Sequence, residues 1–422
     1  MEAKEKKILE TADRLFEQTL DFTARLVAEA STLGNEMGAA TVMEAELQKL
    51  GLETCRIPMD ASQLVAHPGY APVPWPPAGR FNVVGRLPGQ DANGRSALFN
   101  GHLDVVSPEP LRYWRRDPFT PEIEDGWLYG RGAGDMKSGV AAMTYALHTV
   151  CQAGFAPGGP VTIAAVIEEE CSGNGALACL AAGHDADAVL IPEPFGPTLL
   201  TDQVGVLWFK VALNGVPVHV QTATAGVNAI EACYPLMEAL RRLEAELNQA
   251  DRPEAYRDQP HPLNLNIGIL KGGDWPSTVP ADAEFHARLS YFPGVPYAEM
   301  QRRILVAIRA QAEKDPWLAR HPPTVEFYGF RSDGHHLSRN APALRTLNAC
   351  HRDLTGQDAE TYVSTCTTDL RAFTGFGKGQ ATCFGPVAER IHADNERVRL
   401  ESVRHVLRTY ALFLARWCGL YE

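Results

Sequence analysis

The sequence of 422 residues lacks several patterns that mark other classes of protein. Its nine cysteines form no Cys-x-x-Cys pair and are odd in number, so no disulfide framework is indicated. Most of them lie in apolar surroundings, which favours small core residues in a reducing, cytoplasmic compartment. The longest uninterrupted aliphatic run, 161–167 with one threonine, is far too short to span a bilayer, so we expect no membrane association.

Basic runs are also missing, and the formal net charge is -12. Without a stretch that could neutralise phosphates, nucleic acid is not expected as a partner. An anionic substrate would have to be held by local arginines or by metal ions. The remaining composition, 45% apolar and 21% charged, is typical of a globular protein, and the length predicts two domains.

From residue 81 to about 194 the sequence alternates short apolar strands with helices. Strands are expected at 96–100, 161–167 and 188–192, and a helix at 138–154 separates the first two. Strand–helix–strand units at this spacing predict an α/β fold with a mostly parallel, helix-covered sheet.

The pattern changes near residue 203, where strands with a single apolar face begin. Such strands suit an antiparallel sheet with helices on one side. We therefore expect a catalytic domain of residues 1–203 and 329–422, and an inserted α+β lid domain of residues 204–328. The insert would contain strands at 204–213, 263–270 and 283–291, and helices at 228–247 and 297–314.

The sequence also predicts the local structure of one strand and one loop. Alternation in the strand 263–270 places Leu263, Leu265, Ile267 and Ile269 on one apolar face. The loop 67–77 holds five prolines and is expected to be a stiff excursion over the surface.

Ligand-type side chains follow the expected strands directly. His102 and Asp104 come after the first strand, the acidic triplet 168–170 after the second, and Glu193 after the third. Ligands of such sheets gather at the carboxyl ends of the strands, so these side chains are expected to lie close together. Asp104 is placed to accept the second ring N–H of a metal-bound His102.

Two further candidates lie outside the strands. Asp135 stands in a glycine-rich loop before a helix, and His392 in a loop before the C-terminal helix. Taken singly, Asp135 is equally well interpreted as a helix-capping aspartate, and for His392 an ordinary loop histidine is the favoured interpretation. Together, two histidines and several carboxylates suit Zn²⁺, Co²⁺ or Mn²⁺, and a further unligated glutamate could serve as general base.

These motifs in this order resemble the acetylornithine deacetylase / succinyl-diaminopimelate desuccinylase family, whose relatives include aminoacylases and glutamate carboxypeptidases. The resemblance runs from about residue 80 to the C-terminus. It rests on Asn-Gly-His-x-Asp at 100–104, Gly-Arg-Gly-x-x-Asp-Met-Lys at 130–137, the triplet 168–170, Glu-Pro at 193–194 and His-Ala-x-Asn-Glu at 392–396.

The resemblance implies two divalent metal ions per subunit, with Zn²⁺ favoured over Co²⁺ and Mn²⁺. It implies His102 and Glu193 as ligands of the first metal, His392 and Glu170 as ligands of the second, and Asp135 as the bridge between them. It further implies that Asp104 orients His102 and that Glu169 is the general base.

In the lid, the resemblance implies a homodimer in which His219 reaches across the interface to stabilise an oxyanion. Arg288, with Ser277 nearby, matches the segment that grips a substrate carboxylate, and Arg371 is the next candidate for that role. Two departures leave the substrate open: Ser277 stands where many members carry Asn, and Gln-Thr-Ala-Thr-Ala at 221–225 replaces the usual run of small residues and proline.

The leading hypothesis is a metal-dependent amidohydrolase that removes an acyl group from an N-acyl amino acid or a related amide. A di- or carboxypeptidase using the same dimetal site is the alternative, because lid pockets decide between acyl and peptide substrates. A non-catalytic binding protein of the same fold is the remote alternative. Loss of Glu169 or of a metal ligand would mark such a protein, and none is lost in this sequence.

Overall fold

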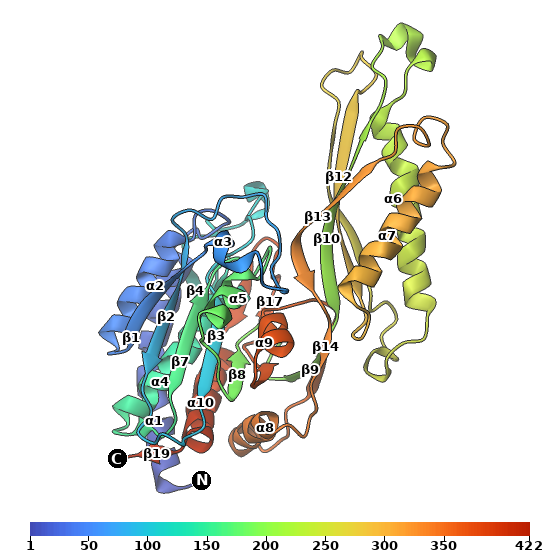
Figure 1. Cartoon of the computed structure of the whole chain (residues 1–422). Coiled ribbons are helices and arrows are strands. Elements are labelled where there is room, and N and C mark those ends of the chain that lie inside the picture. The colour runs from blue at the N-terminus through green and yellow to red at the C-terminus, as the bar shows by residue number, and fades with distance from the viewer.

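The computed structural model describes residues 1–422 apart from the side chain of residue 61, and Figure 1 shows two bodies joined by a narrow waist. The larger body, called the main unit here, is built on a six-stranded sheet of order β1-β2-β7-β3-β8-β16. β7, β3, β8 and β16 run parallel, whereas β1 and β2 join antiparallel, so the predicted mostly parallel sheet is confirmed. The strands are β1 (Glu53–Pro58), β2 (Phe81–Leu87), β3 (Ala97–His102), β7 (Val161–Val166), β8 (Ala188–Ile191) and β16 (Gln380–Cys383).

Helices cover this sheet because their apolar faces match it. In α1 (Ala3–Val27) the buried residues recur at helical spacing, and α4 (Ser138–Gln152) is buried along most of its length. These two helices pack against α10 (Leu400–Trp417). The other helices of the main unit are α2 (Met37–Lys49), α3 (Ala61–Leu64), α5 (Asn174–Ala181), α8 (Pro342–Thr355) and α9 (Leu370–Phe376).

Smaller sheets complete the main unit. β14 (His335–His336), β9 (Leu199–Gln203) and β15 (Thr361–Ser364) pair near the waist, while β4 (Glu122–Glu124), β5 (Trp127–Tyr129), β17 (Ala388–Glu389) and β18 (Arg397–Arg399) form a second small sheet. A third joins β6 (Ala156–Pro157) to β19 (Leu420–Tyr421). Short helical turns occur at Leu111–Tyr113, Ala133–Lys137, Val220–Ala225 and Glu254–Tyr256.

The smaller body, the inserted unit, consists of an antiparallel sheet of order β11-β12-β10-β13 with two helices on one face (Figure 1). Its elements are β10 (Gly205–Asn214), α6 (Ala229–Gln249), β11 (Leu265–Gly272), β12 (Asp282–Tyr291), α7 (Tyr297–Ala312) and β13 (Thr324–Ser332). It has its own hydrophobic core, which includes Phe209, Phe285 and Leu289. This agrees with two domains, while the boundaries at 204 and 328 stay a prediction.

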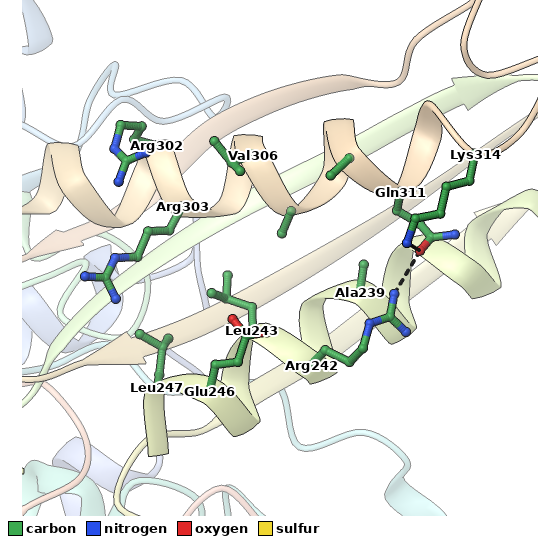
Figure 2. Close-up of a pocket in the computed structure, with 12 residues that line it drawn as sticks. Ala239, Arg242, Leu243, Glu246, Leu247, Arg302, Arg303, Val306, Gln311 and Lys314 are labelled. Atoms are coloured by element: carbon green, nitrogen blue, oxygen red, sulfur yellow. Dashed lines mark hydrogen bonds between the residues drawn. The ribbon is translucent and has the colours of Figure 1, made fainter. Parts of the chain in front are cut away.

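A groove of about 430 Å³ runs between α6 and α7 (Figure 2). Its charged lining residues include Arg242, Arg303 and Lys314, and every lining residue belongs to α6 or to 302–314. The groove is therefore a feature of the helical face of the inserted unit and is separate from the predicted ligands.

The prediction that the strand 263–270 has a single apolar face is wrong near the C-terminal end of that strand. Leu263 and Leu265 are buried, but Ile269 is 42% exposed. A bulge lies between Ile267 and Ile269 in the pairing of β11 with β12. The extra residue, Gly268, shifts the alternation by one position and turns Ile269 outward.

The proline-rich loop lies at the surface as predicted, with Pro68, Pro72, Pro74 and Pro76 exposed, and it also ties the two units together. The main chain of Ala71 exchanges hydrogen bonds of 2.9 and 3.0 Å with the Asn174 side chain. The carbonyl of Pro72 accepts a 2.7 Å hydrogen bond from the main-chain N–H of Gly329 in β13. Prolines restrict the backbone, so this loop holds its carbonyls in place at low entropic cost.

Among the described residues, none of the helices has the length and apolar character needed to cross a bilayer. All nine cysteines are free thiols.

Two histidines, the buried His351 and the half-buried His405, form a pair between α8 and α10. His405 Nε2 lies 2.9 Å from His351 Nδ1, and the ring of Phe384 packs edge-on against His351. Burial, followed by the influence of His351 and Arg408, lowers the pKa of His405 to about 4. Burial likewise lowers the pKa of His351, although Asp358 opposes the shift.

This pair predicts a stability loss in mild acid. In the unfolded chain a histidine has a pKa of about 6.5, so the stabilising neutral form is favoured above that pH and stability falls between pH 6.5 and about 4. For His405 the shift corresponds to roughly 3 kcal/mol at most. Thermal melts at pH 7 and pH 5 should show a smaller Tm drop for His405→Gln than for the wild type. The exposed His321→Gln should behave like the wild type, and an identical drop in all three proteins would contradict the assignment.

Candidate metal centre

The predicted ligands converge at the carboxyl ends of the parallel strands. His102 is the last residue of β3, the triplet 168–170 follows β7, and Glu193 follows β8. Asp135 lies in the turn at Ala133–Lys137 that precedes α4, and His392 lies between β17 and β18. Five segments, far apart in the sequence, thus contribute to one edge of the sheet, as expected for this class of fold.

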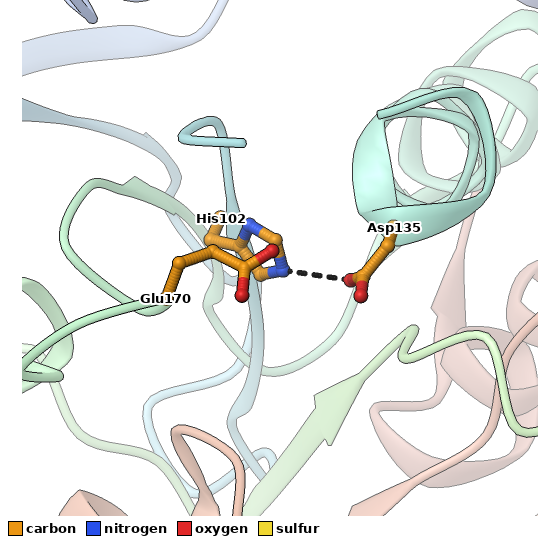
Figure 3. Close-up of side chains that lie close together, drawn as sticks. All are labelled: His102, Asp135 and Glu170. Atoms are coloured by element: carbon orange, nitrogen blue, oxygen red, sulfur yellow. Dashed lines mark hydrogen bonds and ion pairs between the residues drawn. The ribbon is translucent and has the colours of Figure 1, made fainter. Parts of the chain in front are cut away.

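Asp135 stands between the two histidines. Its Oδ1 lies 3.1 Å from His102 Nε2, and its Oδ2 lies 3.3 Å from His392 Nε2. His392 Nε2 also lies 3.0 Å from Glu170 Oε2. One donor atom each from His102, Asp135 and Glu170 lie within 4.8 Å of one another (Figure 3). A carboxylate with one oxygen toward each histidine has the geometry of a bridging ligand.

Charge explains why this cluster suits cations. Burial disfavours ionisation of Asp135, but hydrogen bonds from His102 and His392 outweigh it and hold the pKa of Asp135 below its usual range. Burial lowers the pKa of His392, yet Glu170 and Asp135 reverse the shift and raise it to about 11. Protons on the histidines therefore compensate the carboxylates, and divalent cations could take over that role.

Glu193 is buried beside this cluster. Its Oε1 has no hydrogen-bond partner in the part of the chain that the structure describes. Burial, followed by the negative charge of Asp135, raises the pKa of Glu193 well above its usual range. A buried carboxylate oxygen without a donor is costly, so the vacant lone pairs fit a metal ligand.

Glu169 is also buried, and its pKa is raised well above the ordinary value. Burial is the main cause, and the carboxylate of Glu193 adds to it. A carboxyl group with a raised pKa can accept and return a proton near neutral pH, which is what a general base requires.

Asp104 contacts His102 differently from the expectation. His102 Nδ1 lies 2.9 Å from the main-chain carbonyl of Asp104 and 3.8 Å from its carboxylate Oδ1. The carboxylate instead accepts main-chain N–H bonds from Glu169, at 3.2 Å, and from Glu170, at 3.1 Å. Asp104 thus fixes the His102 tautomer through its backbone and positions the glutamate loop through its side chain. Burial raises the pKa of Asp104 to about 7.

Glu168, the first glutamate of the same loop, holds the loop in place through its side chain. It adopts a left-handed backbone conformation, φ +68°, which is uncommon for a residue with a side chain. Its carboxylate pairs with Arg80 and Ser172 and accepts a 2.9 Å bond from Trp75 Nε1. Arg80 also pairs with the buried Glu36. Sequence reasoning missed Glu36, Trp75 and Arg80, because nothing local in those segments indicates a buried partner.

A second network holds Asp135. Glu396 Oε1 accepts the main-chain N–H groups of Gly134 and Asp135, both at 2.9 Å, and Glu396 Oε2 pairs with Arg131 Nη1 at 2.5 Å. Glu396 belongs to the motif at 392–396, so its position in that string was the available signal for its importance.

The remaining predicted residues lie outside the cluster. His219 and Ser277 are exposed in the inserted unit, where His219 Nδ1 accepts a 3.1 Å bond from the main-chain N–H of Gln221. Arg288 lies on β12, and burial lowers its pKa. Arg371 is buried in α9 and donates to the main-chain carbonyls of Ser172 and Arg331.

The chain is similar to several known enzymes along most of its length. An N-formyl-4-amino-5-aminomethyl-2-methylpyrimidine deformylase from Halalkalibacterium halodurans is 26% identical over 359 residues, which cover 80% of this chain and 83% of the relative. A succinyl-diaminopimelate desuccinylase from Alkalilimnicola ehrlichii is 26% identical over 413 residues, which cover 95% of this chain and all of the relative. The fold matches a dipeptidase from Saccharomyces cerevisiae with a TM-score of 0.80 at 14% identity, over 100% of both chains.

The model of "Peptidase family M20/M25/M40" matches residues 98–416. This range contains every ligand candidate described above, from His102 to His392. The chain therefore belongs to peptidase family M20/M25/M40 and is a hydrolase of amide C–N bonds.

Proposed function

We propose that this chain is a dimetal amidohydrolase that removes an acyl group from the amine of an N-acyl amino acid or a related amide. The observation that carries the proposal is Asp135 with one oxygen toward each of His102 and His392, next to the buried Glu169. Bridging carboxylate, paired histidines and an adjacent base with a raised pKa form the set that metal-assisted hydrolysis needs.

The donor atoms fit two divalent cations. His102 and Glu193 would hold the first, His392 and Glu170 the second, and Asp135 would bridge them. Imidazole and carboxylate donors suit Zn²⁺ best, with Co²⁺ or Mn²⁺ as other candidates. When bound, such a pair supplies Lewis-acid polarisation of the amide carbonyl and lowers the pKa of water.

Glu169 performs the proton transfers in this proposal. Its carboxylate takes a proton from the attacking water and returns it to the leaving nitrogen. Asp104 holds the main chain of Glu169 and Glu170 in place, so the base and its neighbouring ligand keep their relative orientation.

A peptidase is the second candidate function, and the same cluster would serve it. A metallo-carboxypeptidase from Sulfolobus solfataricus and human carnosine dipeptidase 1 share the fold, with TM-scores of 0.73 and 0.75 at 16% and 15% identity. The matches to the deformylase and the desuccinylase cover most of the length of those proteins, at a higher identity than the matches to the two peptidases. This supports the deacylase.

For the substrate carboxylate we propose Arg288, with Ser277 as a neighbouring polar group. Among the described residues no carboxylate acts on the Arg288 guanidinium, whose pKa is lowered by burial, an effect opposed only by the Cys366 thiol, so its charge is free for a ligand. Arg371 donates hydrogen bonds to main-chain carbonyls of both units, and we propose that it holds the two units together.

A substrate panel tests the proposed function. N-acetyl, N-succinyl, N-formyl and N-carbamoyl amino acids should be compared with dipeptides, using protein loaded with Zn²⁺ or Co²⁺. We expect turnover of at least one acyl class, loss of activity on chelation, and recovery with two metal equivalents by elemental analysis. Turnover of dipeptides alone would favour the peptidase, and full activity after chelation would exclude the dimetal mechanism.

Replacing Glu169 separates the base from the ligands. Glu169→Gln keeps the shape and the hydrogen-bonding capacity but cannot take up the proton, so kcat should fall by roughly 10²–10⁴. Both metal ions should remain bound, which elemental analysis can measure. Glu170→Gln is the matched comparison and should weaken metal binding itself. If Glu169→Gln loses a metal and retains residual turnover, the two glutamates have been assigned the wrong way round.

We further propose a homodimer formed through the inserted unit, in which His219 completes the partner's site. His219 is exposed, and the nearby Trp275 is 68% exposed, as are parts of β11 such as Leu270, at 46%. An open edge strand with apolar side chains suits pairing with a second copy. Aimed at the developing oxyanion, His219 would contribute about 2.7–4 kcal/mol.

Complementation tests this arrangement. His219→Ala and Glu169→Gln should each be inactive alone, yet mixed heterodimers should regain activity, because one of their two sites has an intact base and an intact partner histidine. Subunit exchange is verified by differential tagging. Mixed dimers that form but stay inactive would place the action of His219 within its own chain or outside catalysis.

A further inference from the structure

The face of the inserted sheet that α6 and α7 leave open carries a small recess beside Arg288. Alternation along β10 and β12 buries Phe209, Phe285 and Leu289 under the helices and places Trp208, His286 and Arg288 on the opposite face. Asn266, Arg288 and Trp208 are directly paired across three neighbouring strands. They form one row, and the recess lies along it.

The walls of the recess are aromatic rings in fixed orientations. The ring centroids of Trp208 and Tyr328 are 6.1 Å apart at 69°, and those of His286 and Tyr328 are 5.6 Å apart at 89°. His286 Nδ1 lies 2.5 Å from the Tyr328 hydroxyl, and its Nε2 lies 3.2 Å from Glu284 Oε1. Because the polar atoms of His286 and Tyr328 pair with each other and with Glu284, the ring carbons remain to line the recess.

The bulge in β11 keeps the recess open. Gly268 lines it, and a side chain built at this position would meet only the amide nitrogen of Asn266, at 3.3 Å, among atoms within 4 Å. The recess has a volume of about 160 Å³. An apolar cavity of about 150 Å³ takes one benzene molecule, so the space fits a single six-membered ring.

Position relates the recess to the metal centre. A Cβ atom built at Gly329 of β13 would lie 2.7 Å from Trp208 Cε3 and 2.9 Å from the main-chain carbonyl oxygen of Cys171, the residue that follows Glu170. Trp208, which lines the recess, therefore lies close to the backbone next to a predicted metal ligand. Arg288 is the cross-strand neighbour of Trp208 and lines the same recess.

We propose that this recess is the side-chain subsite of the enzyme and that it selects N-acyl amino acids with an aromatic side chain. The proposal rests on the proposed amidohydrolase function. With the scissile amide at the ligand cluster and the α-carboxylate on Arg288, the side chain of the same amino acid extends between Trp208 and Tyr328. Edge-to-face contacts with these rings and burial of apolar area favour a phenyl or heteroaromatic ring over a methyl group.

Binding to a protein that cannot turn over the ligand tests the subsite apart from the chemistry. In the Zn²⁺-loaded Glu169→Gln protein, calorimetry should show N-acetyl-L-phenylalanine binding at least about tenfold more tightly than N-acetyl-L-alanine. Adding Trp208→Ala removes one wall, and adding Gly268→Val fills the space without removing a contact. Each should bring the ratio of the two dissociation constants close to one, with little change for the alanine ligand.

Controls distinguish the subsite from general damage. Glu326→Gln changes an exposed residue of β13 on the same sheet and should leave the ratio unchanged, whereas Arg288→Lys should weaken both ligands alike. A ratio near one in the Glu169→Gln protein, or a ratio that survives both Trp208→Ala and Gly268→Val, would overturn the proposal. If the ratio is as expected but no acyl substrate is hydrolysed, the subsite stands and the proposed function fails.

Discussion

The structure depends on the burial of several carboxylates at one edge of the main sheet. Asp135, Glu169 and Glu193 are all buried there, and the only positive groups that contact Asp135 directly through side chains are His102 and His392, among the described residues. Negative charge brought this close together in a low-dielectric setting is unfavourable unless protons or cations compensate it. Whatever ion the site holds therefore contributes to folding as well as to chemistry.

Two networks of charged side chains stabilise the loops that carry these buried carboxylates. Arg80 pairs with Glu168 and Glu36 under the glutamate loop, and Arg131 pairs with Glu396 under the loop of Asp135. In both places the arginine pairs with a carboxylate that supports the backbone. Among the described residues, the carboxylates of the predicted ligands and of the base pair with no arginine or lysine, and only histidines contact them as cations. Fixed supports with free inner carboxylates are what a preorganised metal site requires.

Much of this arrangement could be predicted from the sequence, since strand ends in a parallel sheet converge by topology. Placing His102, Glu170 and Glu193 together needed only the period of the apolar runs and the motif order. The supports could not be found in this way, because Trp75 and Arg80 meet Glu168 only after the chain has folded. The hydrogen bonds of the Asp104 side chain could not be predicted for a related reason. A side chain two residues from His102 has several donors within reach, and it accepts from the main chain of the glutamate loop only once the chain has folded.

In the inserted unit, too, the sequence alone does not predict the position of one side chain. Strict alternation along 263–270 would place Ile269 in the core, and the bulge at Gly268 turns it outward. Gly268 has no side chain to fill the space beside Trp208. The bulge that makes the predicted alternation wrong therefore also shapes the recess. In the function proposed here, chemistry and selectivity reside on different sheets: the ligand cluster on strand ends of the main unit, and the recess on the sheet of the inserted unit. We therefore expect substitutions in the recess to alter which amine is accepted without disturbing the buried carboxylates of the main unit.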